Sequence, residues 1–137
     1  MPVIAWMLLI FVGSTDVLSA EQTSRFVVPF LHWLYPQMSF ATILAIHVGL
    51  RKLGHIIEYA ILAALLWRAV RGTLTSTRTI AIAGLVFFAS VLFAASDEFH
   101  QSFVPTRTPS MNDVMIDACG VVIALALCLV LRSKRSA

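Results

Sequence analysis

The feature that most constrains the fold is a pair of long apolar runs, residues 79–96 and 114–131, separated by a polar stretch. Each run has about the 17–20 residues that a helix needs to cross a bilayer core. Of the 137 residues, 59% are hydrophobic and only 12% are charged, whereas a soluble domain has about 25% charged residues. So little charge cannot cover a water-facing surface. We therefore predict an all-α, polytopic helical membrane protein that forms a single domain over residues 1–137.

The first part of the chain combines a short apolar run with a mixed segment. Residues 2–13 are apolar, but twelve residues span only about 18 Å, so the run crosses the membrane only with tilting or snorkelling. We expect a retained span, because no Lys or Arg precedes the run. A secretory signal cleaved near residues 18–20 and a start further upstream are the alternatives. Residues 21–36 have one apolar face and contain Pro29, so we expect an interfacial helix, capped by Ser24.

The remaining spans follow from apolar length and charge. Residues 38–50 form an apolar helical stretch bounded by Gly49 and Gly54, and the second span is expected over residues 55–70. The runs 79–96 and 114–131 complete a set of about four spans. The 68–78 loop and the C-terminal tail each carry three basic residues and no acid, which predicts that both lie in the cytoplasm. Both termini are then cytoplasmic, and the 97–113 loop faces outward.

Polar side chains gather at the outward ends of three predicted spans. At the start of the second span, residues 55, 58 and 59 share one helical face, and two cations lie one turn earlier. The third span ends with the same spacing, at residues 97, 100 and 101, and residues 113 and 117 are one turn apart in the fourth. Acids inside spans usually face the bundle interior and find partners. The predicted ligand-binding residues are Arg51, Lys52, His55, Glu58, Tyr59, Asp97, Glu98, Gln101, Arg107, Asp113 and Asp117.

The chemistry of these groups leaves several interpretations open. Arg51, Lys52 and Arg107 are cations on the predicted outer side, which favours either ion pairing or an anionic ligand, and arginine suits bidentate phosphate or carboxylate. The acid–base candidates are His55, Glu58, Asp97 and Asp117, because carboxylates held close in a low dielectric acquire separated pKa values. The purely structural alternative is that His55 and Glu58 pair with Arg107 and Asp117 only to hold the helices together. Neighbouring Asp97 and Glu98 cannot point the same way on a helix, so Glu98 is expected to serve the loop.

Other classes of site receive little support. Nitrogen and oxygen donors are numerous, but no tight signature such as HExxH is present, so no metal site is assigned and the cofactor is unknown. Cys119 and Cys128 cannot pair within one helix and are expected to be buried apolar residues. Nucleic acid is not a predicted partner, because the sequence has no cluster of basic residues interleaved with aromatic ones.

Three motifs together resemble the VanZ-like family. They are R-K-x-x-H-x-x-E-Y at residues 51–59, D-E-x-H-Q-x-x-x-P-x-R at 97–107 and D-x-x-x-D-x-x-G at 113–120. The departure is Thr106, where glycine is expected between proline and arginine. The resemblance implies an integral membrane protein whose site opens toward cell-wall precursors or amphiphilic anions. The founding member is associated with resistance to teicoplanin, a lipid-bearing glycopeptide that acts at the outer face.

Three functional hypotheses remain. The first is an outward-facing protein of the cell membrane that recognises an anionic lipid-linked or lipoglycopeptide-type molecule, with a role in teicoplanin-type antibiotic resistance or in the cell envelope. The second is a membrane enzyme that acts on a lipid-linked substrate through Glu58, Asp97 or Asp117. The third is a purely structural helical bundle or subunit. In each case membrane lipid is the surrounding partner.

Overall fold

The computed structural model of the chain describes residues 2–136, which form five α-helices, one short 3-10 helix and no strand. In chain order these are α1 (Pro2–Gly13), η1 (Asp16–Leu18), α2 (Ala20–Leu34), α3 (Phe40–Thr73), α4 (Thr79–Gln101) and α5 (Met111–Ser136). Three of them, α3, α4 and residues Met111–Lys134 of α5, are long and apolar enough to cross a membrane, and α1 is a shorter apolar helix. The protein is therefore an all-α membrane protein.

The longest element, α3, joins two segments that the sequence led us to separate. Gly49 and Gly54 were expected to bound the stretch that begins at residue 38, but one 34-residue helix runs through both. A glycine inside a helix costs only about 1 kcal/mol relative to alanine. Breaking a helix next to lipid leaves backbone groups unpaired, which costs several kcal/mol for each group. The helix therefore continues, and it brings residues 40–54 into line with the second predicted span.

The other boundaries also differ from the predicted ones. The N-cap of α2 is Ser19, whose hydroxyl accepts from the backbone N–H of Gln22 at 3.2 Å, and not Ser24, which lies inside the helix. Helix α4 runs five residues past the predicted end, to Gln101, and carries the polar residues from 97 onward as helix. These residues consequently have fixed faces, which a loop would not give them.

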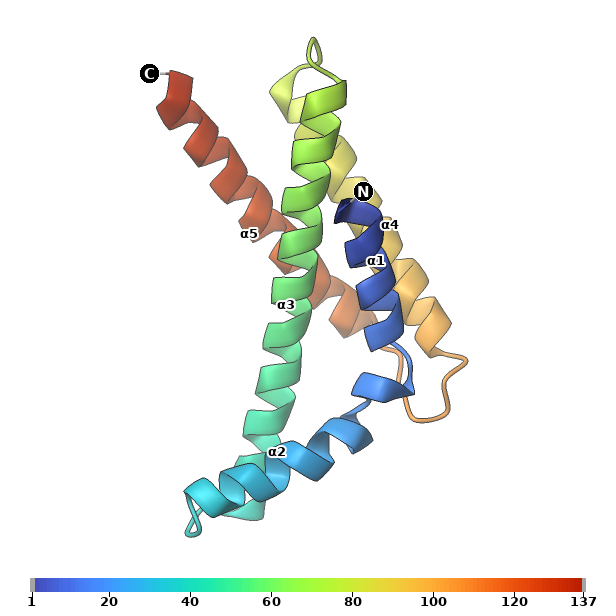
Figure 1. Ribbon diagram of the computed structural model, residues 1–137, viewed down its shortest axis with the longest axis vertical. Helices are drawn as coiled ribbons and strands as arrows, with labels where there is room; N and C mark the ends of the chain where they lie inside the picture. Colours follow the sequence, from blue (N-terminus) through green and yellow to red (C-terminus); the bar gives the residue numbers. More distant parts are fainter. Residues whose placement is uncertain (1, 137) are drawn as a thin grey trace.

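The three long helices pack around a common core, and α1 lies along α3 (Figure 1). Tyr59, Leu62, Val86 and Val121 are among the fully buried side chains of this core. Helices α3 and α5 cross where a Cβ atom on Gly120 would overlap the carbonyl oxygen of Ile56. Glycine is therefore needed at this position for the two backbones to approach so closely.

Helix α2 crosses the N-terminal part of α3, at the end of the bundle away from the 74–78 turn (Figure 1). None of its described residues is buried, and Phe26, Phe30 and Trp33 are exposed by 57–78%. Such a helix suits the membrane interface, where aromatic side chains lie at the headgroup level. The tie to α3 is polar: the hydroxyl of Thr23 lies 2.9 Å from Nε2 of the buried His47.

One expectation about cysteine is wrong. Cys119 was expected to be buried, but it is exposed on α5, and Cys128 is half-buried. Both thiols are free, as their helical spacing requires.

Candidate functional site

One face of α3 carries three ionisable side chains into a cavity. Arg51, His55 and Glu58 are spaced at i, i+4 and i+7, so a continuous helix presents them in a row. They line a cavity of about 160 Å³ at the end of the bundle where α2 lies. We call this the first cavity; its lining residues are Gly13, Ser14, Thr23, Arg51, Gly54, His55, Glu58, Gln101 and Arg107.

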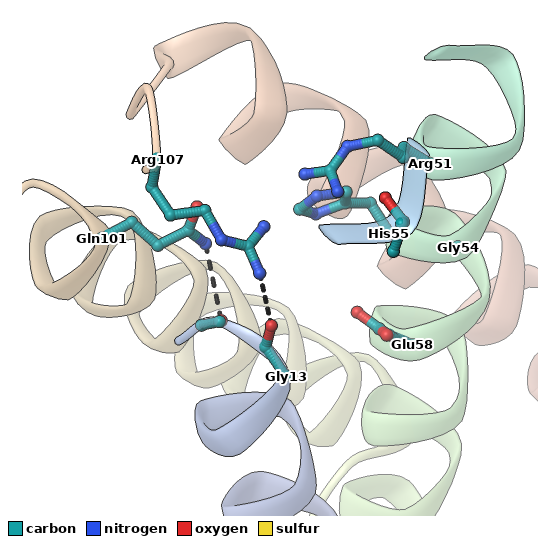
Figure 2. Close-up of a pocket in the computed structure, with 9 residues that line it drawn as sticks. Gly13, Arg51, Gly54, His55, Glu58, Gln101 and Arg107 are labelled. Carbon is teal, nitrogen blue, oxygen red and sulfur yellow. Dashed lines mark hydrogen bonds between the residues drawn. The ribbon is translucent and has the colours of Figure 1, made fainter. Parts of the chain in front are cut away.

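Arg107 reaches the first cavity from the opposite side, out of the loop between α4 and α5. Figure 2 shows its guanidinium group across the cavity from Arg51, His55 and Glu58. Nε and Nη2 of Arg107 donate to the carbonyl oxygen of Thr15 at 3.1 and 2.9 Å, and Nη2 also donates to the carbonyl oxygen of Gly13. These acceptors lie at the C-terminal end of α1, where a cation is favourable. Arg107 therefore ties the loop to α1 and also supplies charge to the cavity.

The electrostatics at Arg107 reflect its position. Burial, and then the nearby cation of Arg51, lower the pKa of Arg107 from its ordinary value. An arginine is nevertheless charged at any physiological pH. Two guanidinium groups from distant parts of the chain thus face one cavity, together with the carboxyl group of Glu58.

His55 has a fixed partner on α5. Its Nδ1 lies 3.0 Å from Oδ1 of Asp117, which is 1% exposed. Because the hydrogen bond fixes one ring nitrogen, the opposite nitrogen of the imidazole is left for another partner. The pair joins α3 to α5 and orients the imidazole ring.

Asp97 lies behind the wall of the first cavity. Its Oδ2 accepts from the hydroxyl of Ser14 and from Nε2 of Gln101, the latter at 3.1 Å. Its Oδ1 is buried and makes no hydrogen bond with the described residues. Asp97 therefore holds Gln101 and the end of α1 in place, and its two partners, Ser14 and Gln101, line the cavity.

Glu98 points to the loop. Its Oε2 accepts from the backbone N–H of Ser110 at 2.8 Å, directly before α5 begins. This bond fixes the loop that carries Arg107.

A second cavity adjoins the first on the side of α2. Its volume is about 270 Å³, and it shares Arg51 and His55 with the first cavity. Its other lining residues are Ala20, Ser24, Leu44, His47, Val48, Lys52 and Asp113. Lys52 and Asp113 thus lie apart from Glu58 and Arg107, on the other side of Arg51.

A comparison with models of protein families gives a match along most of the chain. A family model described as VanZ/LLP1 matches residues 1–132, nearly the whole chain. The chain belongs to the VanZ/LLP1 family. No curated protein and no solved structure gives a significant match.

The position at which this VanZ/LLP1 chain departs from the expected motif has a role of its own. The hydroxyl of Thr106 donates to Oδ1 of Asp16 at 2.5 Å, which connects the loop to η1. This hydrogen bond, followed by one from Gln22, lowers the pKa of the exposed Asp16 carboxyl. No described non-glycine residue has a positive φ, so the turn does not require glycine at Thr106.

Tyr59 was predicted to bind a ligand, but it lies in the hydrophobic core. It is 1% exposed and belongs to the core, with its ring 6.3 Å from that of Phe93. It lines neither cavity. Tyr59 follows His55 by one helical turn, so the sequence predicts a similar face for the two. Its side chain points about 100° away from that of Glu58, however, and this direction is the interior of the bundle. His100, from the same motif set, packs its ring 4.2 Å from that of Phe11.

Sequence reasoning missed the contributions of the first part of the chain. Gly13, Ser14 and Thr23 line the first cavity and His47 lines the second. One signal was available: His47 precedes Arg51 by four residues, hence by one turn on the same face. The approach of Ser14 to α4 and of Thr23 to α3 could not be inferred, because it depends on how α1 and α2 pack. Within residues 2–136, no group of three or more His, Cys, Asp or Glu side chains is arranged to hold a metal ion.

Proposed function

We propose that this VanZ/LLP1 protein binds the anionic head group of a lipid-linked or lipoglycopeptide-type molecule in the first cavity. The observation that carries the proposal is the pair of guanidinium groups, Arg51 and Arg107, that face this cavity from two segments. Arginine binds phosphate and carboxylate through two parallel hydrogen bonds. Gly54 leaves its part of the wall without a side chain, which keeps room for a head group.

The proposed orientation puts this cavity at the outer face of the membrane. The 74–78 turn and the C-terminal end of α5 lie at one end of the bundle, and α2 lies at the other (Figure 1). The first cavity is lined by Thr23 of α2 and by Gly13 at the end of α1. The basic residues near the 74–78 turn and the C-terminal end of α5 include Arg71, Arg78, Arg132 and Lys134. Short loops rich in Lys and Arg remain in the cytoplasm. The cavity would then meet head groups of the outer leaflet.

The direct test compares two ligands that differ only in charge. Farnesyl phosphate and farnesol share one chain, so the purified protein in neutral detergent should bind the first at least about 10-fold more tightly, as expected for charge-assisted hydrogen bonds. Arg107→Lys keeps the charge but loses the planar group of donors that bonds the carbonyl oxygens of Gly13 and Thr15. The cation is then no longer held at the cavity, which should weaken binding of the phosphate. Arg78→Gln, at the other end, is the matched control. Equal affinity for both ligands would refute the proposal.

The lipoglycopeptide part of the proposal needs a growth test. Cells that express the protein should tolerate teicoplanin better than cells that express Arg51→Gln at the same level. A glycopeptide without the acyl chain is the control and should give no difference. If tolerance is the same with and without Arg51, resistance does not arise from binding in this cavity.

A second candidate function is acid–base catalysis on the same class of ligand. It is favoured by the imidazole of His55, which Asp117 orients at 3.0 Å and which lines both cavities, the first of them together with Glu58. A histidine oriented by a carboxyl group in this way is an arrangement that general bases use. If the groups only lock helices, the double substitution of Glu58 and Asp117 by alanine lowers stability alone. If they are catalytic, the folded double variant loses turnover on lipid phosphates that the unaltered protein converts.

A further inference from the structure

The two cavities are arranged as neighbours with one shared cation. Arg51 lines both, whereas Arg107 lines only the first and Lys52 only the second. Arg51 and Lys52 are consecutive residues of α3, and consecutive side chains on a helix point about 100° apart. Lys52 therefore cannot take the place of Arg51 in the first cavity. Each cavity has one cation of its own, and Arg51 stands between them.

The cations of the site extend over both cavities, two in each, with Arg51 shared. Over both cavities the cations Arg51, Lys52 and Arg107 outnumber the carboxyl groups of Glu58 and Asp113 by three to two, and His55 already pairs with a carboxylate. A single phosphate in the first cavity would leave Lys52 unused. Two phosphoryl groups joined by a bridging oxygen would instead place one group in each cavity, with Arg51 between them.

The volumes are compatible with this division. The first cavity, at about 160 Å³, is similar to a cavity of about 150 Å³ that holds benzene, a molecule not far in size from a phosphoryl group. The second, at about 270 Å³, has room for a phosphoryl group and the first atoms of a chain. Leu44 and Val48, one turn apart on α3, line the second cavity and are 45% and 44% exposed. They form an apolar path from this cavity to the outer surface of the bundle.

We infer that the two cavities together bind a diphosphate-linked amphiphile. The phosphoryl group that bears the apolar chain lies in the second cavity beside Lys52, the chain leaves past Leu44 and Val48, and the distal phosphoryl group lies in the first cavity beside Arg107. This inference rests on the proposed function, since it names the head group of the ligand.

The test uses three probes on the full chain in neutral detergent: farnesyl diphosphate, farnesyl phosphate and inorganic pyrophosphate. The unaltered protein should bind the diphosphate at least about 10-fold more tightly than farnesyl phosphate, because one charge-assisted contact is worth about that factor. It should also bind the diphosphate more tightly than inorganic pyrophosphate, because only the farnesyl ligand buries an apolar chain. Lys52→Gln should remove that advantage over farnesyl phosphate. Lys52 is exposed, so the variant should fold, and an unchanged melting temperature checks this. Lys134→Gln, at the other end, should change nothing.

The outcomes distinguish this inference from the proposed function. If both farnesyl ligands bind equally, or if Lys52→Gln weakens both by the same factor, the diphosphate inference is wrong and the anion site stands. If neither ligand binds, both are wrong. If inorganic pyrophosphate binds as tightly as farnesyl diphosphate, the apolar path is wrong and the ligand is not an amphiphile.

Discussion

At the scale of residues, the polar groups divide into those that face the cavities and those that hold them. Arg51, His55 and Arg107 face the cavity. Asp117 holds His55, and backbone carbonyls of the α1–η1 segment hold Arg107. Many of the predicted site residues therefore stabilise the packing of the helices. Ligand binding and stabilisation of the bundle do not exclude each other. The same side chain can do both where a cavity lies beside a helix junction.

The His55–Asp117 pair gives the first prediction. His55→Ala should lower the free energy of unfolding by about 1–3 kcal/mol, because it leaves the oxygen of a fully buried carboxyl group without its partner. Asp113→Asn, at a half-buried position one turn away, should cost less than about 0.5 kcal/mol. Unfolding of the purified protein in detergent measures both. Equal effects of the two substitutions would show that the pair does not stabilise the α3–α5 junction.

The Thr106–Asp16 hydrogen bond predicts a pH effect with a definite sign. The folded state lowers the pKa of Asp16, so the stabilisation is fully present above the ordinary carboxyl pKa of about 3.9 and is lost as the pH falls through the lowered value. Thr106→Val should raise the pKa of Asp16 part of the way to its ordinary value, because the hydrogen bond from Gln22 remains. An NMR titration of the Asp16 carboxyl carbon measures this. Thr108→Val is the control, and an equal shift there would contradict the assignment.

At the scale of elements, the close crossing of α3 and α5 sets the geometry of the site. It fixes the rotation at which Asp117 meets His55, and it depends on the absence of a side chain at Gly120. Helix α3 was predicted in two pieces, because the glycines at 49 and 54 resemble helix ends. Apolar surroundings override that local signal.

Two glycine substitutions test the element scale. Gly120→Ala should destabilise the protein by about 1–3 kcal/mol, because the new methyl group meets the backbone of Ile56 and cannot be accommodated by a flexible side chain. Gly49→Ala, with nothing within 4 Å of the new Cβ atom, should instead stabilise the helix by up to about 1 kcal/mol. Thermal unfolding of both variants gives the comparison. If Gly120→Ala is neutral, the two backbones are not in contact.

Much of the fold could be predicted from the sequence, and less of the site. Apolar length and the low content of charge are sufficient for the class, since lipid must cover what charge does not. Helical spacing predicted one shared face for residues 55, 58 and 59. His55 and Glu58 line the first cavity, whereas Tyr59 lies in the core. The pairing of His55 with Asp117, the core position of Tyr59 and the approach of Ser14 to Asp97 depend on how helices rotate about their axes. That rotation is set by contacts between segments distant in sequence.

At the scale of the whole molecule, the account requires one orientation in the membrane. After both cysteines are replaced by alanine, Thr108→Cys in the 102–110 loop should react with a membrane-impermeant maleimide on intact cells. Ser76→Cys, in the turn at the other end, should react only after permeabilisation. Both positions are exposed. The reverse pattern would place the first cavity in the cytoplasm and remove the outer leaflet as its source of ligand.

The central claim is that Arg51 and Arg107 act on one anion. A double-mutant cycle in the affinity for farnesyl phosphate, built from Arg51→Gln, Arg107→Gln and the double variant, tests it most directly. Two cations that share one phosphate should be coupled, so the account predicts an interaction energy of at least about 0.5 kcal/mol in folded variants. Losses that add to within about 0.3 kcal/mol, or no loss in either single variant, would contradict it.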